Sequence, residues 1–203
     1  MFDVLTYEFL SKISVESSLS VNLANFSMSK FTDEDLDKIF KDLILIKKKE
    51  NFILDYPRKS GVGFRIKSFD SVQLNSRKAI LCFNDLIGFL VICDSLPNLN
   101  EIPDYFKVVD LSNGKVDDGG YRGLHLYFKL SNRHYPIEVQ IWSKYDAQFI
   151  NWMHKYSYKH LSSEVGRRLR QLYEKGSITT ESEFKQELDV ILARQYFNQR
   201  FGG

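Results

Sequence analysis

The sequence is poor in cysteine, since only Cys82 and Cys93 occur among its 203 residues. Two isolated thiols in apolar surroundings fit a reducing compartment better than a disulfide framework or a metal site. No hydrophobic run approaches the roughly 20 residues that a transmembrane helix requires. The basic stretch that begins a signal peptide is also missing, because Asp3 and Glu8 occupy that region. We therefore expect a cytoplasmic protein without a membrane segment.

Internal repeats and low-complexity linkers are missing as well. Because 203 residues are long enough for one well-cored domain, the chain is expected to form a single domain over residues 1–203. Its 43% hydrophobic and 27% charged residues are typical of a globular protein, and 16 Phe and 11 Tyr favour a core with a β-sheet. Within the domain we expect a helical N-terminal part over 1–50, a sheet core over 51–160 and C-terminal helices over 161–203.

Charge is segregated along the chain, although the net charge is only +2. Residues 41–78 hold ten Lys or Arg against four acids, whereas residues 79–120 hold seven acids against two Lys. This split is consistent with an anionic partner beside a metal-binding acidic pocket. The alternative is that both runs are simply solvated faces, as most charge runs are.

Apolar periodicity predicts the order of helices and strands. The expected helices are 2–13, 33–49, 69–78, 146–160, 164–175 and a last helix near the C-terminus. This last helix is opened by a capping box at Thr180 and Glu183 and has an apolar stripe at Phe184, Leu188, Ile191 and Leu192. The expected strands are 52–56, 62–66, 80–83, 89–93, 106–111, 124–130 and 135–141. Helices at both ends and strands between them indicate an α+β fold, a mixed β-sheet flanked by helices.

The stretch 115–141 combines a glycine-rich loop with a predicted hairpin. Gly119 and Gly120 permit positive φ or close approach to a ligand, and Tyr121, Arg122 and His125 then offer a stacking face, a cation and a titratable ring. Glu138 lies inside the apolar return strand. A carboxylate there is costly to bury without a cationic partner, so we interpret it as facing a metal site; the alternative is a surface Glu on an edge strand.

Two further clusters suit phosphate and metal chemistry. Arg65 and Lys67 leave one strand on the same side, and Ser71 follows in the helix expected next, an arrangement that suits phosphate. Asp85 lies between two apolar strands and could bind Mg²⁺ if Glu138 faces it, because Mg²⁺ is usually held by one or two carboxylates and substrate phosphates. The alternatives are exposed cations at a strand end and a turn Asp that caps its own backbone.

Five motifs in order resemble the synthetase domain of the RelA/SpoT family over roughly residues 50 to 160. They are R-x-K-x-x-x-S at 65–71, D-x-x-G at 85–88, G-Y-R-x-x-H at 120–125, E-V-Q-I at 138–141 and H-x-x-x-Y-K at 154–159. The resemblance implies a nucleotidyltransferase-like sheet that moves the β,γ-pyrophosphate of ATP onto a 3′-hydroxyl. It also indicates a small stand-alone alarmone synthetase, because no hydrolase or regulatory domain is present.

The same resemblance implies a role for each matching residue. Arg65, Lys67 and Ser71 would hold ATP. Asp85 and Glu138 would be catalytic and hold Mg²⁺, and Glu138 would also take the hydroxyl proton. The acceptor would bind to Tyr121, which stacks on its base, to Arg122 and His125, which hold phosphate, and to Gln140. Supporting roles would fall to His154, Tyr158 and Lys159.

Four positions depart from the family pattern. Asn75, Leu90 and Trp142 replace cations, and Met153 replaces an acid. The segment between Cys93 and Val108 is also short for the helix that nucleotide-making enzymes usually carry there. Each charge-assisted phosphate contact is worth roughly 1.5 to 3 kcal/mol, so these losses should weaken binding of a free, highly charged acceptor.

The short connections and the aromatic strand resemble the toxic small alarmone synthetases of toxin–antitoxin pairs, several of which pyrophosphorylate the 3′ end of tRNA. We therefore favour the tRNA 3′-CCA end as acceptor, with a neutralising antitoxin protein as a further partner. Basic groups outside the pocket could replace the lost cations, at Lys47–Lys49, at Arg58 and Lys59, or at Arg167, Arg168 and Arg170. The alternatives are a (p)ppGpp synthetase using GDP or GTP, its adenine-nucleotide equivalent, and a degenerate non-catalytic nucleotide- or RNA-binding module.

Overall fold

The structure is a computed structural model that describes residues 1–19, 27, 30–55, 62–66, 82–115, 119–156 and 162–201. The chain divides into two compact units, the first formed by Met1–Val109 with Leu124–Ile141 and the second by Asp110–Gly123 with Trp142–Gly203. Each unit has a hydrophobic core of its own. That the whole chain acts as one domain stays a prediction.

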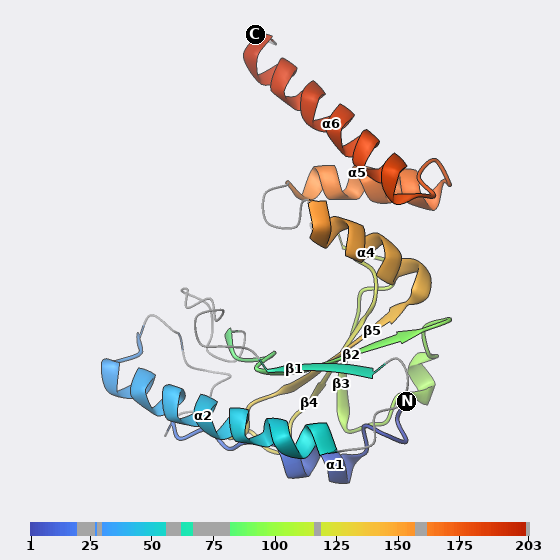
Figure 1. Cartoon of the computed structure of the whole chain (residues 1–203). Helices are drawn as coiled ribbons and strands as arrows, with labels where there is room; N and C mark the ends of the chain where they lie inside the picture. The colour runs from blue at the N-terminus through green and yellow to red at the C-terminus, as the bar shows by residue number, and fades with distance from the viewer. Residues whose placement is uncertain are drawn as a thin grey trace. The chain divides into compact units, whose positions relative to one another are not determined.

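The first unit is a five-stranded sheet with helices packed on it (Figure 1). Its elements are α1 (Tyr7–Ile13), α2 (Asp33–Asp55), β1 (Val62–Ile66), β2 (Ile87–Cys93), the 3₁₀-helix η3 (Leu99–Glu101), β3 (Phe106–Asp110), β4 (Leu124–Phe128) and β5 (Ile137–Ser143). The strand order is β1-β2-β5-β4-β3, and the pairs β1/β2 and β4/β5 are antiparallel. The expected mixed sheet flanked by helices is confirmed.

One face of the sheet is apolar and packs on α1 and α2. On β4 the buried residues are Leu124, Leu126 and Phe128, and on β5 they include Ile137, Val139 and Ile141. Aromatic rings of α1 meet the strands edge-on, Phe9 against Phe89 and Tyr7 against Phe128. Because side chains alternate across a strand, His125 and Tyr127 must lie on the opposite face.

Helix α2 follows a capping threonine, Thr32, and continues further than its sequence pattern indicated. Thr32 accepts a hydrogen bond from the Asp35 backbone, and the Asp35 carboxylate accepts one in return from the Thr32 backbone. The strand expected over 52–56 is wrong over 52–55, because the helix continues to Asp55, and Tyr56 lies outside the described residues. Its physical reason is that buried Ile46 and Ile53 lie seven residues apart, which keeps both on one helical face.

Other strand predictions differ from the structure at their ends. Strand β2 begins at Ile87, two residues before the expected start. The strand expected over 80–83 is wrong where it is described, since Cys82 is helical and Phe83 lies in a bend. The helix expected over 69–78 lies outside the described residues. Between β2 and β3 the chain has only the three-residue η3, which agrees with the short segment noted in the sequence.

A buried carboxylate joins α2 to two distant segments of the first unit. Asp42 is fully buried and accepts hydrogen bonds from the backbone and the hydroxyl of Ser18. It also accepts one from the Tyr135 hydroxyl at 2.8 Å, and burial raises the pKa of that phenol far above its ordinary value. These bonds satisfy a carboxylate that would otherwise be costly to bury.

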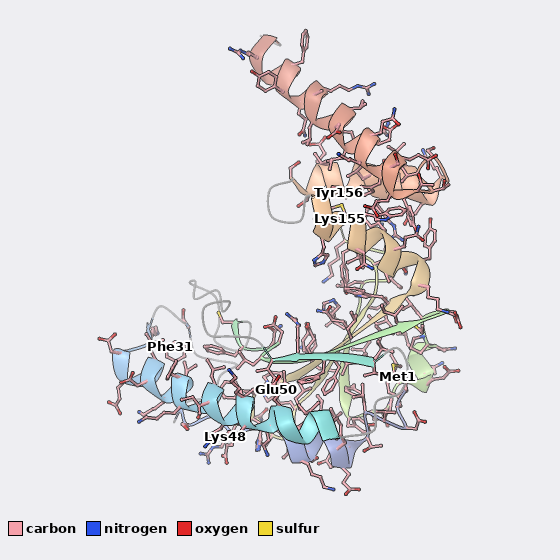
Figure 2. The ribbon with its side chains drawn as sticks, in the orientation of Figure 1. Met1, Phe31, Lys48, Glu50, Lys155 and Tyr156 are labelled. Carbon is pink, nitrogen blue, oxygen red and sulfur yellow. The ribbon has the colours of Figure 1, made fainter. Side chains whose placement is uncertain are left out.

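The second unit contains the three C-terminal helices α4 (Lys144–Tyr156), α5 (Ser163–Glu174) and α6 (Glu181–Phe201). Its core includes Phe149 and Trp152 of α4, Leu169 and Tyr173 of α5, and Phe184 of α6. Figure 2 labels Lys155 and Tyr156 at the end of α4. Both donate to the Glu181 carboxylate at the start of α6. None of the described helices is apolar over a long enough stretch to cross a bilayer.

The capping box expected before the last helix is confirmed. The Glu183 backbone donates to the Thr180 hydroxyl, and the Glu183 carboxylate accepts from the Thr180 backbone. Backbone and side-chain hydrogen bonds from Thr179 and Thr180 lower the pKa of Glu183 to about 2. The stripe on this helix is only partly as expected, since Phe184 and Leu188 are buried whereas Leu192 is exposed.

Candidate active site

Strands β4 and β5 bring four polar side chains together on the face of the sheet opposite the core. Across the antiparallel pair, His125 lies opposite Gln140 and Tyr127 lies opposite Glu138. Residues two apart on a strand point to the same face, so the four side chains share one surface. Glu138 is therefore on the polar face, as its position between buried Ile137 and Val139 requires.

Glu138 is almost completely enclosed and hydrogen-bonded through both carboxylate oxygens. Its side chain is 5% exposed. One carboxylate oxygen, Oε1, accepts from the Tyr127 hydroxyl at 2.9 Å and from Nδ1 of His125 at 2.9 Å. The other, Oε2, accepts from Nε2 of Gln140 at 2.8 Å. A carboxylate accepts about four such bonds, so these donors occupy most of its capacity.

The hydrogen bonds determine the protonation state of Glu138. Burial alone raises the pKa of this carboxyl, but the bonds from His125, Tyr127 and Gln140, with the charge of His125, outweigh burial and lower the pKa below its ordinary value. Glu138 is consequently ionised at neutral pH. An ionised carboxylate can bind a cation or accept a proton.

A single guanidinium connects Glu138 with the second candidate carboxylate. Nη2 of Arg65 lies 3.3 Å from Oδ2 of Asp85 and 3.4 Å from Oε2 of Glu138. Arg65 is on β1 and Glu138 on β5, with β2 between them. Arg65 passes over Gly88 of β2, where an added Cβ would lie 3.2 Å from its Nε. The glycine of D-x-x-G thus leaves room for an arginine to reach across a neighbouring strand.

The two carboxylates are suitable ligands for Mg²⁺. Within the described ranges, no group of three or more His, Cys, Asp or Glu side chains could hold a metal ion. Mg²⁺ is, however, commonly bound by one or two carboxylates while substrate phosphates and water complete its octahedron. The Arg65 guanidinium is a positive group already held between Asp85 and Glu138, so the donor set fits a bound cation.

The glycine-rich loop and its aromatic residue belong to the second unit. Gly119 and Gly120 have φ values of 63° and 89°, which favour glycine. The Tyr121 hydroxyl accepts a 2.6 Å hydrogen bond from the indole N–H of Trp142, and the two rings meet edge-on with centroids 6.2 Å apart. Nη1 of Arg122 donates to the Tyr121 carbonyl, and Nε lies 3.6 Å from the Glu174 carboxylate.

The structure therefore gathers the predicted site residues in two groups. Arg65, Asp85, His125, Glu138 and Gln140 lie together in the first unit, and Tyr121 and Arg122 lie together in the second. The residues Lys67, Ser71, Asn75, Tyr158 and Lys159 lie outside the described residues. His154 is exposed in the last turn of α4.

Three positions that depart from the family pattern are described. Leu90 is half-buried on β2, and half-buried Met153 packs against the core of the second unit. Trp142 is 8% exposed and holds the Tyr121 hydroxyl. At each of these positions an apolar side chain, half-buried or buried, stands where the family pattern has a charge.

Sequence reasoning missed Tyr127, which donates directly to Glu138. The signal was available in the alternation of the strand, because Tyr127 follows His125 by two residues and must share its face. The bond of Trp142 to Tyr121 left no such signal, since the two residues are 21 positions apart.

The sequence matches no protein-family model and no curated protein. Among solved structures the chain is similar to small alarmone synthetase 1 from Bacillus subtilis bound to its product pppGpp, with 19% identity, 80% of this chain and 92% of that chain covered, and a TM-score of 0.42. It is similar to small alarmone synthetase 2 from Bacillus subtilis, with 20% identity, 78% and 93% covered, and a TM-score of 0.39. A GTP pyrophosphokinase family protein from Streptococcus pneumoniae shows 14% identity, 82% and 93% covered, and a TM-score of 0.38. Such distant likenesses assign neither a substrate nor an activity to this chain.

Proposed function

We propose that the chain is a RelA/SpoT-type pyrophosphokinase that transfers the β,γ-pyrophosphate of ATP to a 3′-hydroxyl. One observation carries the proposal: a buried, ionised Glu138 lies on the polar face of the sheet and shares a cation with Asp85. Enclosing a charge in this way is costly, and such perturbed carboxylates concentrate at functional sites. The order of the five sequence motifs supports the same reaction.

In the proposed reaction the acceptor hydroxyl oxygen attacks the β-phosphorus of ATP. The bond from that phosphorus to the oxygen bridging the α-phosphate breaks, and AMP leaves with that oxygen. The hydroxyl proton passes to Glu138 and then to solvent. Among the hydrogen-bond donors to Glu138, Arg65 is the one that the acceptor hydroxyl would displace. Its contact with Glu138 is the longest at 3.4 Å, and its side chain is 52% exposed.

Asp85 and Glu138 would hold Mg²⁺. The bound ion would supply charge neutralisation for the phosphates of ATP. Once released from the carboxylates, Arg65 could turn to those phosphates together with Lys67 and Ser71, which is the role that the resemblance gives it. The Arg65 side chain would then pair with the two carboxylates before ATP binds and with the phosphates of ATP afterwards.

The favoured acceptor is the 3′-CCA end of tRNA, which would make the chain a translation-inhibiting toxin, cytoplasmic and neutralised by an antitoxin protein. Tyr121 would stack on the terminal base, and Arg122, His125 and Gln140 would bind the remaining acceptor groups. A basic pocket of about 500 Å³ between α5 and α6 supports an RNA acceptor, because Arg167, Arg168 and Arg194 line it together with a single described acid, Glu164. Phosphate contacts there could replace the cations absent at Leu90 and Trp142.

A free guanine nucleotide is the second candidate acceptor, which would make the chain a GTP pyrophosphokinase, and an adenine nucleotide is its counterpart. The observation that favours them is Tyr121, whose ring could stack on any nucleobase. A non-catalytic binding module is a weaker alternative, since it would have no need of an ionised carboxylate with a complete set of donors.

The test is to incubate the protein with γ-labelled ATP and Mg²⁺ and to offer GDP, GTP, AMP, ADP, ATP and bulk tRNA separately. We expect label on tRNA with the wild type, a loss of at least about 100-fold with Glu138→Gln, and no change with the exposed control Glu101→Gln. Label on nucleotides alone would identify the second acceptor class. No label on any acceptor would leave only the non-catalytic module.

A further inference from the structure

We infer that helix α5 positions the loop Gly119–Arg122 through three of its own residues, Gly166, Arg170 and Glu174. The inference rests on the proposed function in that this loop would carry the acceptor. It adds residues of α5 that neither the sequence motifs nor the proposed reaction uses. They are positioning residues, because they would act on the acceptor only through Tyr121 and Arg122.

The loop and the helix touch backbone to backbone. A Cβ added to Gly166 would lie 2.2 Å from the carbonyl oxygen of Gly119, a distance that no side chain can occupy. In the other direction, a Cβ on Gly120 would lie 2.7 Å from the carbonyl oxygen of Gly166 and 2.8 Å from Cβ of Arg170. Glycine is required on both sides of this contact.

The contact explains why α5 contains a glycine. Glycine in a helix interior is unfavourable relative to alanine, because it loses more conformational freedom on folding. Gly166 is buried next to Val165 on the face that meets the loop. Any larger residue there would have to move the loop or the helix, so Gly166 sets how closely the loop approaches.

A second contact holds the other end of the loop through charge. The buried side chain of Arg170 donates from Nη2 to Asp146 at 2.5 Å and from Nε to Glu174 at 2.7 Å. The same Glu174 oxygen lies 3.6 Å from Nε of Arg122. Glu174 is thus fixed by one arginine and attracts another, which determines where the Arg122 guanidinium lies.

Aromatic rings keep Arg170 in place. Its guanidinium lies 5.2 Å from the Phe149 ring centroid, 5.6 Å from that of Tyr145 and 5.7 Å from that of Tyr173. The rings of Tyr145 and Tyr173 stack with centroids 4.4 Å apart. Cations over ring faces are held electrostatically as well as by packing, so Arg170 forms a rigid base for Glu174.

Tyr121 lies between these two fixed points. Gly119 and Gly120 are held by the α5 backbone on one side, and Arg122 is held by Glu174 on the other. Trp142 then orients the Tyr121 ring through its hydroxyl. The ligand that suits this arrangement has a flat base for Tyr121 and an anionic group for Arg122, as in the terminal nucleotide of the proposed acceptor.

Gly166→Ala tests the backbone contact, and Ser163→Ala in the same helix is its control. In a Trp152→Phe background Trp142 becomes the only tryptophan and reports on Tyr121 by its emission. We expect Gly166→Ala to shift that emission, to lower Tm and to raise KM for the acceptor at least about tenfold while leaving KM for ATP unchanged. Ser163→Ala should change none of these.

Gly→Ala raises stability in a helix where no neighbouring group obstructs the added methyl. A higher Tm with unchanged Trp142 emission and unchanged acceptor KM would therefore overturn the inference. Inactivity of the wild type with every acceptor would refute the proposed function instead, and the emission of Trp142 would still decide whether α5 positions the loop.

If Gly166→Ala does not fold, Glu174→Gln examines the second contact, because Glu174 is 42% exposed and tolerates substitution better. We expect a several-fold increase in acceptor KM that disappears when Arg122 is already Gln. An increase of the same size in both backgrounds would show that Glu174 acts independently of Arg122.

Discussion

Tyr127 lies directly opposite Glu138 across the β4/β5 pair and donates its hydroxyl hydrogen to Oε1 of that carboxylate at 2.9 Å. His125 contacts the same oxygen, also at 2.9 Å. One oxygen therefore carries two donors from a single strand, while the other faces Gln140 and Arg65. This division leaves the second oxygen as the one that can exchange partners during a reaction.

Tyr127→Phe should raise the pKa of Glu138, because it removes a donor that stabilises the ionised form. A lowered pKa stabilises the fold above the unfolded value of 4.5, and that stabilisation disappears as pH falls through the folded pKa. We expect the free energy of unfolding to fall by about 1.5–3 kcal/mol at pH 7 and by less toward pH 3. In the pH profile of kcat/KM, the acid limb should move to higher pH. Urea unfolding at both pH values measures the first effect.

Tyr105→Phe is the control for that experiment, since the Tyr105 hydroxyl donates to the Leu5 carbonyl and to no carboxylate. Its stability loss should be about 0.5–1.5 kcal/mol at either pH. A loss at Tyr127 that is equally independent of pH would contradict the assigned bond to Glu138.

Gly88→Val should displace Arg65 from Asp85 and Glu138, because the added side chain occupies the path of the arginine. The matched control is Gly63→Val. Gly63 lies on the same face of β1 as Arg65, and an added Cβ there would have only the Leu90 carbonyl at 3.9 Å as a described neighbour. We expect a several-fold increase in KM for ATP at fixed Mg²⁺ with Gly88→Val and little change with Gly63→Val. Equal values for the two variants would mean that the path over Gly88 is unimportant.

Tyr121→Phe should be intermediate between wild type and Tyr121→Ala in use of the acceptor. Stacking survives in Phe and is worth roughly 1 to 3 kcal/mol, but the Trp142 indole loses its acceptor. A double-mutant cycle with Trp142→Phe should therefore give a coupling of about 0.5–1.5 kcal/mol in the acceptor KM. Additive effects would show that the hydrogen bond has no part in orienting the ring.

Two of the basic groups considered for RNA binding need correction. Arg170 is 4% exposed and paired with Asp146, so it cannot contact RNA. Lys49 is half-buried and donates to the Lys12 carbonyl, which leaves Lys47 and Lys48 as the exposed members of the run Lys47–Lys49. The pocket residues Arg167, Arg168 and Arg194 form a better arginine group.

Changing those three arginines to Gln should weaken tRNA binding. It should also reduce the slope of the logarithm of the tRNA binding constant against the logarithm of salt concentration by as much as about 2 to 3, because each arginine would make one phosphate contact. Binding of an ATP analogue should hardly change. The control is the triple change of Lys175, Lys185 and Arg200 to Gln, exposed residues of the second unit outside the pocket. Titration at several salt concentrations compares them, and identical slopes would remove the support for RNA binding.

Asp42→Asn should destabilise the first unit, because the amide has one acceptor oxygen where the carboxylate has two for the three donors of Ser18 and Tyr135. Leaving buried hydroxyl and backbone donors unpaired costs about 1–3 kcal/mol each. The exposed Asp37 on the same helix is the control, and Asp37→Asn should change stability by less than about 0.5 kcal/mol. Urea midpoints of the two variants give the comparison.

Much of the first group of site residues could be predicted because it depends on local periodicity. The alternation from Leu124 to Phe128 and from Ile137 to Ile141 determines which side chains share a face, and it placed Glu138 there. The contact of Arg65 with Glu138 could not be derived in this way. It requires the strand order β1-β2-β5, which depends on pairings between residues far apart in sequence.

The buried arginine shows the opposite limit. In the run R-R-L-R, charge alone groups Arg167, Arg168 and Arg170 on one surface. Helical spacing places Arg170 four residues after Gly166, beside the stripe of Val165, Leu169 and Tyr173, and so at the edge of the core. Its partner Asp146 is 24 positions away, and no sequence pattern links the two.

The hairpin also determines the order in which the site can form during folding. The donors of Glu138 are 13, 11 and 2 residues away along the chain, whereas Arg65 is 73 residues away. Closing a short loop costs little entropy and takes microseconds, so β4 and β5 can align these three donors as soon as they pair. Arg65 reaches the carboxylate only after β1 and β2 have joined β5. A complete chain that refolds from denaturant would thus hold Glu138 in its final hydrogen-bonded form before the cation that bridges it to Asp85 arrives.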